Sequence, residues 1–167
     1  LYLMTTLRAL IPATQVFHLK SIGFDCLSDS AVQAIFRDGR AFSHFIEPWL
    51  AQQLWRDKET GVEFTLQHVK GCKSHDFVVK DEVTTLYYDE KTFTSGGCKF
   101  MPSGMIGKGR KFDAAEFQEK VKTMNYVIVD NTEFPKITVK FANGEELAKQ
   151  YPTGSIPYKD RCEFFSS

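Results

Sequence analysis

The chain has 167 residues, of which 43% are hydrophobic and 25% charged, with only 11 Gly and 6 Pro. This composition is typical of a folded domain and excludes a disordered, collagen-like or low-complexity chain. Lys plus Arg and Asp plus Glu both total 21, so the formal net charge is zero. Any affinity for nucleic acid must therefore come from a local basic patch.

Length and cysteine pattern set expectations about domain count and location. A chain of this size supports one core better than two marginal halves, so we expect a single domain over residues 1–167. No uncharged run approaches the ~18 residues of a membrane span, and no signal peptide is evident. The four cysteines form no C-x-x-C pair, and Cys72-x-x-His75 is at most half of a zinc site. We expect reduced thiols in a cytoplasmic protein without a membrane partner.

The N-terminal third predicts helices. Residues 1–28 are expected to form a short helix and loops on the core. The cap-like cluster Ser28-Asp29-Ser30 precedes a helical turn or two. Apolar residues then recur at helical spacing from Phe42 to Leu54, which predicts an amphipathic helix that Pro48 should kink.

Strand signals dominate the middle of the chain. Alternation over 62–66 and β-rich runs at 77–79 and 84–93 predict an antiparallel meander of three strands. Residues 95–111 are expected to be a loop.

The last third predicts a helix followed by two strands. Asp113 and Glu116 have the spacing of a capping box, and the helix after them should precede strands at 126–129 and 137–141. A further short helix is expected from Glu145. The fold class is therefore α/β (α+β), with a mixed central sheet that contains the meander and is flanked by helices.

One short motif carries the candidate chemistry. Asp89-Glu90-Lys91 is the only acid-x-Lys triplet in the chain and falls on the third predicted strand. The strand period places Asp89 and Lys91 on one face and Glu90 on the other. Asp76 begins the preceding strand, and two carboxylates on adjacent strands can share a hard cation such as Mg²⁺. A lysine beside that cation suits hydrolysis of a phosphodiester.

These residues resemble the PD-(D/E)XK, or restriction-endonuclease-like, nuclease superfamily. Its core is a helix, a three-stranded meander, a helix and a further strand, and the resemblance covers about residues 40–130. It implies that Asp76, Asp89 and Glu47 hold Mg²⁺, or Mn²⁺, and that Lys91 is the catalytic lysine. His75 departs from the pattern, because it replaces the signature proline before the first acid. On this resemblance, residues 1–167 form a nuclease-like domain with its core at about 40–142.

A basic loop follows the motif directly. Residues 95–112 contain Lys99, Lys108, Arg110 and Lys111 and no acidic residue. Glycines in this loop would let backbone N–H groups approach phosphates, and the cations would attract a polyanion without regard to sequence. We expect these four side chains to bind DNA, although a solvated surface loop would have the same composition.

The expected function is a metal-dependent DNA endonuclease that hydrolyses phosphodiester bonds. The alternative is a non-catalytic nucleic-acid-binding or interaction module on the same fold. A third interpretation is an unrelated small α+β protein in which the triplet is coincidental. The sequence leaves open the target, the choice between DNA and RNA, endonuclease against exonuclease action, and the oligomeric state, a homodimer included.

Overall fold

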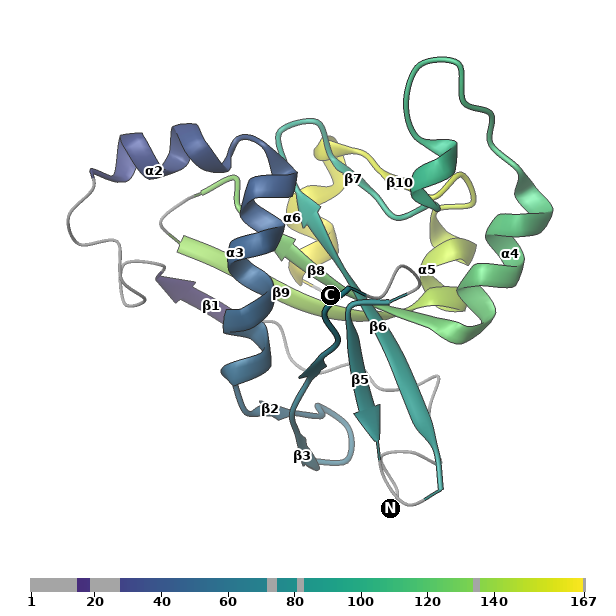
Figure 1. Ribbon diagram of the computed structural model, residues 1–167, viewed down its shortest axis with the longest axis horizontal. Helices are drawn as coiled ribbons and strands as arrows, with labels where there is room; N and C mark the ends of the chain where they lie inside the picture. The colour runs from purple at the N-terminus through teal and green to yellow at the C-terminus, as the bar shows by residue number, and fades with distance from the viewer. Residues whose placement is uncertain (1–14, 19–27, 72–74, 81–82, 134–135, 167) are drawn as a thin grey trace.

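The computed structural model describes residues 15–18, 28–71, 75–80, 83–133 and 136–166. A mixed six-stranded sheet lies at its centre (Figure 1). Its strands are β1 (Gln15–His18), β4 (Gln67–His68), β5 (Phe77–Lys80), β6 (Thr85–Phe93), β8 (Met124–Asp130) and β9 (Lys136–Asn143). They are ordered β1-β9-β8-β6-β5-β4. The pair β6–β8 is parallel and all the other pairs are antiparallel.

Helices and two short ribbons cover both faces of this sheet. The helices are α2 (Asp29–Phe36), α3 (Gly39–Gln52), α4 (Ala114–Thr123), α5 (Gly144–Gln150), α6 (Arg161–Ser166) and the 3₁₀ turns η3 (Ser103–Met105) and η4 (Tyr158–Asp160). The ribbons pair β2 (Trp55–Arg56) with β3 (Glu63–Phe64), and β7 (Cys98–Lys99) with β10 (Ser155–Ile156). Among the described helices, none is long and apolar enough to cross a membrane.

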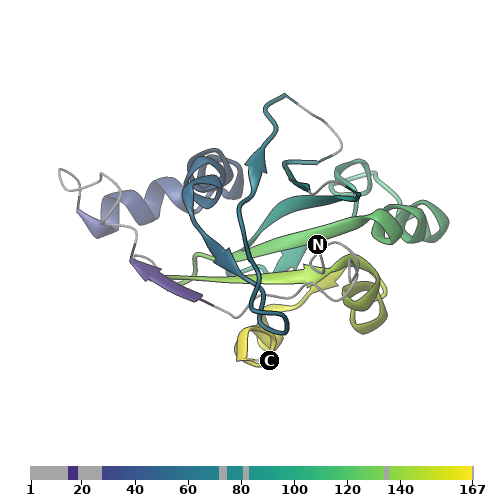
Figure 2. The ribbon, with the colours of Figure 1, turned by 90° about the horizontal axis from the view of Figure 1, so that it is seen from below.

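Two hydrophobic clusters bury the two faces. On one face, Phe42 of α3, Trp55 of β2 and Tyr88 of β6 pack with Phe141 of β9. On the other, the ribbon β7–β10 and helices α4, α5 and α6 pack on the sheet, with α3 and α6 on opposite sides of it in Figure 2. Strand β8 lies between the clusters and every one of its residues is buried. This explains why the sequence shows a continuous apolar run there rather than an alternating one.

In the second half of the chain, the structure confirms the helices that local sequence signals predict. Asp113 Oδ1 accepts a hydrogen bond from the Glu116 backbone N at 3.1 Å, so the predicted cap begins α4. Helix α4 then connects the parallel strands β6 and β8. Asn143 ends β9 and caps α5 by accepting from the Glu146 backbone N at 3.1 Å.

The predicted position of the first strand of the meander is wrong. The meander is β4-β5-β6, and β3 instead pairs with β2 in a separate ribbon. Asp57 explains this difference, because its buried carboxylate accepts hydrogen bonds from the backbone N and hydroxyl of Thr60 and closes a turn between β2 and β3. Phe64 then packs against Phe141, with ring centroids 5.6 Å apart.

Three other expectations are corrected. Residues 15–18 form β1 on the edge of the sheet, and the remaining residues of 1–27 lie outside the described part. The expected loop at 95–111 contains β7 and η3. Helix α3 continues through Pro48 but ends at Gln52, so Leu54 lies outside it and is exposed.

Gly144 provides a test of how α4, α5 and β8 pack. A Cβ at this position would overlap the backbone oxygens of Val121 and Met124. Gly144→Ala should therefore lower the free energy of unfolding by about 1–3 kcal/mol, although alanine is the better helix former. Denaturant unfolding measures this. Gly104→Ala is the matched control, since a Cβ there meets nothing within 4 Å. Equal stability of the two variants would contradict the packing.

Candidate active site

The site begins where β5 stops pairing with β6. The register pairs Phe77 with Tyr88, whereas β8 pairs with β6 as far as Phe93. Among the described residues, no strand pairs with β6 beyond Tyr88 on the β5 side. The edge of β6 from Asp89 to Phe93 is therefore open.

Asp76 ends the ladder between β5 and β6 with its side chain. Its backbone N donates to Tyr88 O at 3.0 Å, and its Oδ2 accepts from the Glu90 backbone N at 2.8 Å. Continuing the register by one residue places Asp76 opposite Asp89. The first predicted acid thus lies beside the acid-x-Lys triplet.

Asp89 and Glu90 contact helices on opposite faces of the sheet. Asp89 Oδ2 lies 3.3 Å from Nζ of Lys120 on α4, with 9% of the Asp89 side chain exposed. Glu90 accepts hydrogen bonds from the hydroxyls of Ser43 on α3, at 2.7 Å, and Thr92, at 2.9 Å. Burial raises the pKa of Glu90 to about 8, although both hydroxyls oppose that rise.

Glu47 brings a third acid from α3. Its Oε1 lies 3.2 Å from Nε2 of His68 on β4. Burial raises the pKa of Glu47, and the charge of Asp76 raises it further. Burial also raises the pKa of Asp76, where the charge of Asp89 adds to the rise and the Glu90 hydrogen bond opposes it. Carboxylates therefore repel one another across this edge of the sheet.

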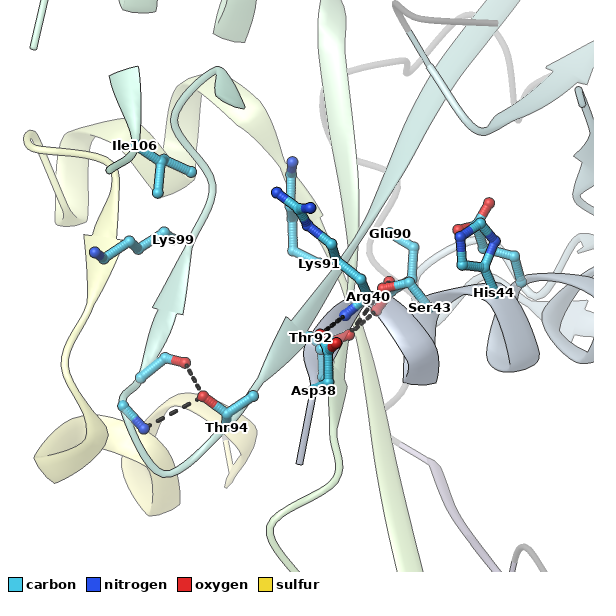
Figure 3. Close-up of a pocket in the computed structure, with 14 residues that line it drawn as sticks. Asp38, Arg40, Ser43, His44, Glu90, Lys91, Thr92, Thr94, Lys99 and Ile106 are labelled. Atoms are coloured by element: carbon cyan, nitrogen blue, oxygen red, sulfur yellow. Dashed lines mark hydrogen bonds between the residues drawn. The ribbon is translucent and has the colours of Figure 1, made fainter. Parts of the chain in front are cut away.

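A cleft of about 630 Å³ runs along the open edge (Figure 3). One wall is the N-terminal half of α3, and the other is formed by the chain from Thr94 through β7 to Ile106. Glu90 and Lys91 line it from β6. Sequence reasoning missed Arg40, Ser43 and Thr92 on its walls. Ser43 and Glu47 share one face of α3 at helical spacing, which is a signal that could have linked them to one site.

The predicted site residues divide into three groups. Glu47, Lys91 and Lys99 line the cleft. Asp76 and Asp89 adjoin the cleft without lining it. Asp76 accepts a hydrogen bond from the backbone N of Glu90, and Asp89 is the residue before Glu90 in β6. The other three predicted DNA-binding residues are exposed on the segment before α4 and do not line the cleft; these are Lys108, Arg110 and Lys111.

The expected metal ligands do not form a complete site as they stand. Within the described part of the chain, no three His, Cys, Asp or Glu side chains are grouped so as to hold a metal ion. Asp76, Asp89 and Glu47 remain a prediction on this point, and Asp89 is paired with Lys120. Cys72 lies outside the described residues, while Cys98 and Cys162 are free thiols.

Glu90 makes the stability of the protein depend on pH. Its pKa is raised from 4.5 to about 8, so between these values the folded protein binds more protons than the unfolded chain. The free energy of unfolding should fall as pH rises through this range, by at most about 1.4 kcal/mol per pH unit from this group. Glu90→Gln should flatten that dependence in denaturant titrations between about pH 5 and 8. The exposed control Glu63→Gln should not, and an unchanged slope in Glu90→Gln would contradict the burial argument.

Comparisons with known proteins add nothing to this geometry. No protein-family model, curated protein or solved structure matches the chain. Its function has to be argued from the site itself.

Proposed function

We propose that this protein is a metal-dependent DNA endonuclease of the restriction-endonuclease-like type. One observation carries the proposal: the hydrogen bond from Glu90 N to Asp76 Oδ2. It holds the acid before β5 against the Asp89-Glu90-Lys91 triplet of β6, at the open edge of the sheet. The cleft beside that edge gives a substrate access to Lys91.

The order of elements around the site supports the same proposal. Helix α3, the meander β4-β5-β6, helix α4 and strand β8 follow one another along the chain. This order supports the resemblance to the PD-(D/E)XK superfamily, whose core is a helix, a three-stranded meander, a helix and a further strand, although β2, β3 and β7 also lie between these elements in this chain. The positions of two acids support the proposal as well, because Asp76 directly precedes β5 and Asp89 lies in β6.

The donor set suits Mg²⁺. Asp76, Asp89 and Glu47 offer carboxylate oxygens, the ligands that hard divalent cations prefer. Burial chiefly raises the pKa of both Glu47 and Asp76, repulsion from a neighbouring carboxylate raises it further, and a cation would relieve that repulsion. When bound, Mg²⁺ would polarise the phosphodiester and lower the pKa of a coordinated water.

Lys91 would act on the phosphate itself. Its positive charge opposes the rise in the pKa of Asp76 and of Glu90, which places the ammonium in the field of these acids. In hydrolysis, a water oxygen bonds to phosphorus and loses a proton to solvent, the ester P–O bond breaks, and the leaving sugar oxygen takes up a proton from solvent. Negative charge grows on the phosphoryl oxygens in the transition state. The Lys91 ammonium, at the floor of the cleft, would stabilise that charge. His68 orients Glu47 through their 3.2 Å contact.

The exposed basic segment would bind the DNA backbone outside the cleft. Lys108, Arg110 and Lys111 follow the cleft wall at Ile106 directly in sequence, and all three are exposed. Contacts of this kind position a duplex without reading its bases.

The ion pair between Lys120 and Asp89 favours a second candidate function. A cation from the chain already neutralises one expected metal ligand, as it could in a non-catalytic DNA-binding module on this fold. Such a module would bind DNA in the presence of Mg²⁺ and cleave none.

Lys91→Ala should separate these two functions. If Lys91 stabilises the transition state, the variant should lose about 10²–10³-fold in cleavage rate at saturating DNA, so the loss of rate is not a loss of DNA binding. Supercoiled, linear and single-stranded DNA are incubated with Mg²⁺ or Mn²⁺, and cleavage is measured on gels.

The matched control is Lys80→Ala, an exposed lysine at the end of β5. It should cleave at the parental rate, and EDTA should stop cleavage by every protein. Cleavage at the parental rate by Lys91→Ala would contradict the role of Lys91. Absence of cleavage by the parent with either metal ion would favour the non-catalytic module.

A further inference from the structure

Three cations from different elements line the cleft. Arg40 lies in the first turn of α3, Lys91 on β6 and Lys99 on β7. In the view of Figure 3, Lys99 is on the wall opposite α3, and Arg40 and Lys91 extend into the space between the walls. Arg40 and Lys99 are exposed, while Lys91 is half-buried. An anion entering the cleft would therefore meet positive charge on both walls and at the floor.

None of these cations forms an ion pair within the described part of the chain. Among the described residues, no carboxylate lies within ion-pair distance of Arg40, Lys91 or Lys99. The acids that line the same cleft already have partners close to them.

Each of those acids contacts a different part of the structure. Asp38 accepts from the Arg40 backbone N at 2.9 Å and caps α3. Glu47 lies 3.2 Å from His68, and Glu90 accepts from Ser43 and Thr92. By contrast, the side-chain N–H groups of Arg40, Lys91 and Lys99 make no hydrogen bond within the described part of the chain and remain available to a ligand.

Cationic donors on two walls suit a ligand with more than one anionic group. Guanidinium binds phosphate through two parallel hydrogen bonds, whereas an ammonium acts as a point charge. The nucleic-acid backbone repeats its phosphates at regular spacing, so a single strand of a duplex can meet several cations in turn. The cleft volume of about 630 Å³ is within the range of known ligand-binding pockets.

We infer that Arg40 and Lys99 bind the two backbone phosphates on either side of the phosphate at Lys91. This inference rests on the proposed function, because it takes the phosphate at Lys91 as the one hydrolysed. It adds Arg40, to which no sequence motif assigns a role. Arg40 and Lys99 are positioning residues, and they act by fixing the register of the DNA strand in the cleft.

The salt dependence of DNA binding tests this inference without catalysis. A short fluorescein-labelled DNA duplex is titrated with the protein in EDTA at several salt concentrations, and anisotropy gives the dissociation constant. Arg40→Ala and Lys99→Ala should each make the plot of log K against log[salt] shallower by about 0.9, and the double variant by about 1.8. Arg40→Lys and Lys99→Arg should keep the parental slope, because they keep the charge.

Arg37→Ala and Lys149→Ala are matched controls. Both residues are exposed and neither lines the cleft, so both variants should keep the parental slope. We expect equal melting temperatures for all variants, because Arg40 and Lys99 are exposed. Equal melting temperatures would exclude a loss of fold as the cause of a change in slope.

The outcomes distinguish the inference from the proposed function. A double variant with the parental slope overturns the inference, even if the parent cleaves DNA with Mg²⁺. A shallower slope in the double variant supports phosphate binding in the cleft. If the parent then fails to cleave DNA with Mg²⁺ or Mn²⁺, the proposed hydrolysis is wrong and the phosphate contacts remain.

Discussion

The hydrogen bond from Glu90 N to Asp76 Oδ2, 2.8 Å long, determines the shape of the candidate site. A backbone N–H at a sheet edge needs an acceptor, and here a carboxylate supplies it where a strand carbonyl would otherwise do so. The strand pairing of β5 with β6 therefore ends at Phe77. Because β6 continues to Phe93 along β8, its edge opens into the cleft, and Asp76 lies beside Asp89.

That arrangement places acids where burial disfavours their charged forms. The pKa of Glu47, Asp76 and Glu90 is raised in each case chiefly by burial. A fold selected for stability alone would gain by replacing such groups with apolar residues of similar volume. Several perturbed carboxylates beside a cleft are more typical of a functional site than of a structural one. The hydroxyls of Ser43 and Thr92 donate to Glu90 and offset part of the free-energy cost of burying that group.

Local signals in the sequence predicted much of the fold. The cap at Asp113, the apolar run of β8 and the placement of the triplet on a strand depend on neighbouring residues, and all three are confirmed. The β2–β3 ribbon was missed because alternation shows that a strand forms and does not show which strand it pairs with. The contact of Asp89 with Lys120 and that of Glu90 with Ser43 join residues far apart in the chain, so no spacing rule could find them.

Anomalous diffraction from crystals grown with Mn²⁺ shows whether Asp76 and Asp89 hold a divalent cation, on which the proposed hydrolysis depends. We expect an anomalous peak bonded to a carboxylate oxygen of each residue at about 2.1–2.2 Å, with Lys120 moved away from Asp89. Density that shows Asp89 still paired with Lys120 and no Mn²⁺ at Asp76 would contradict it.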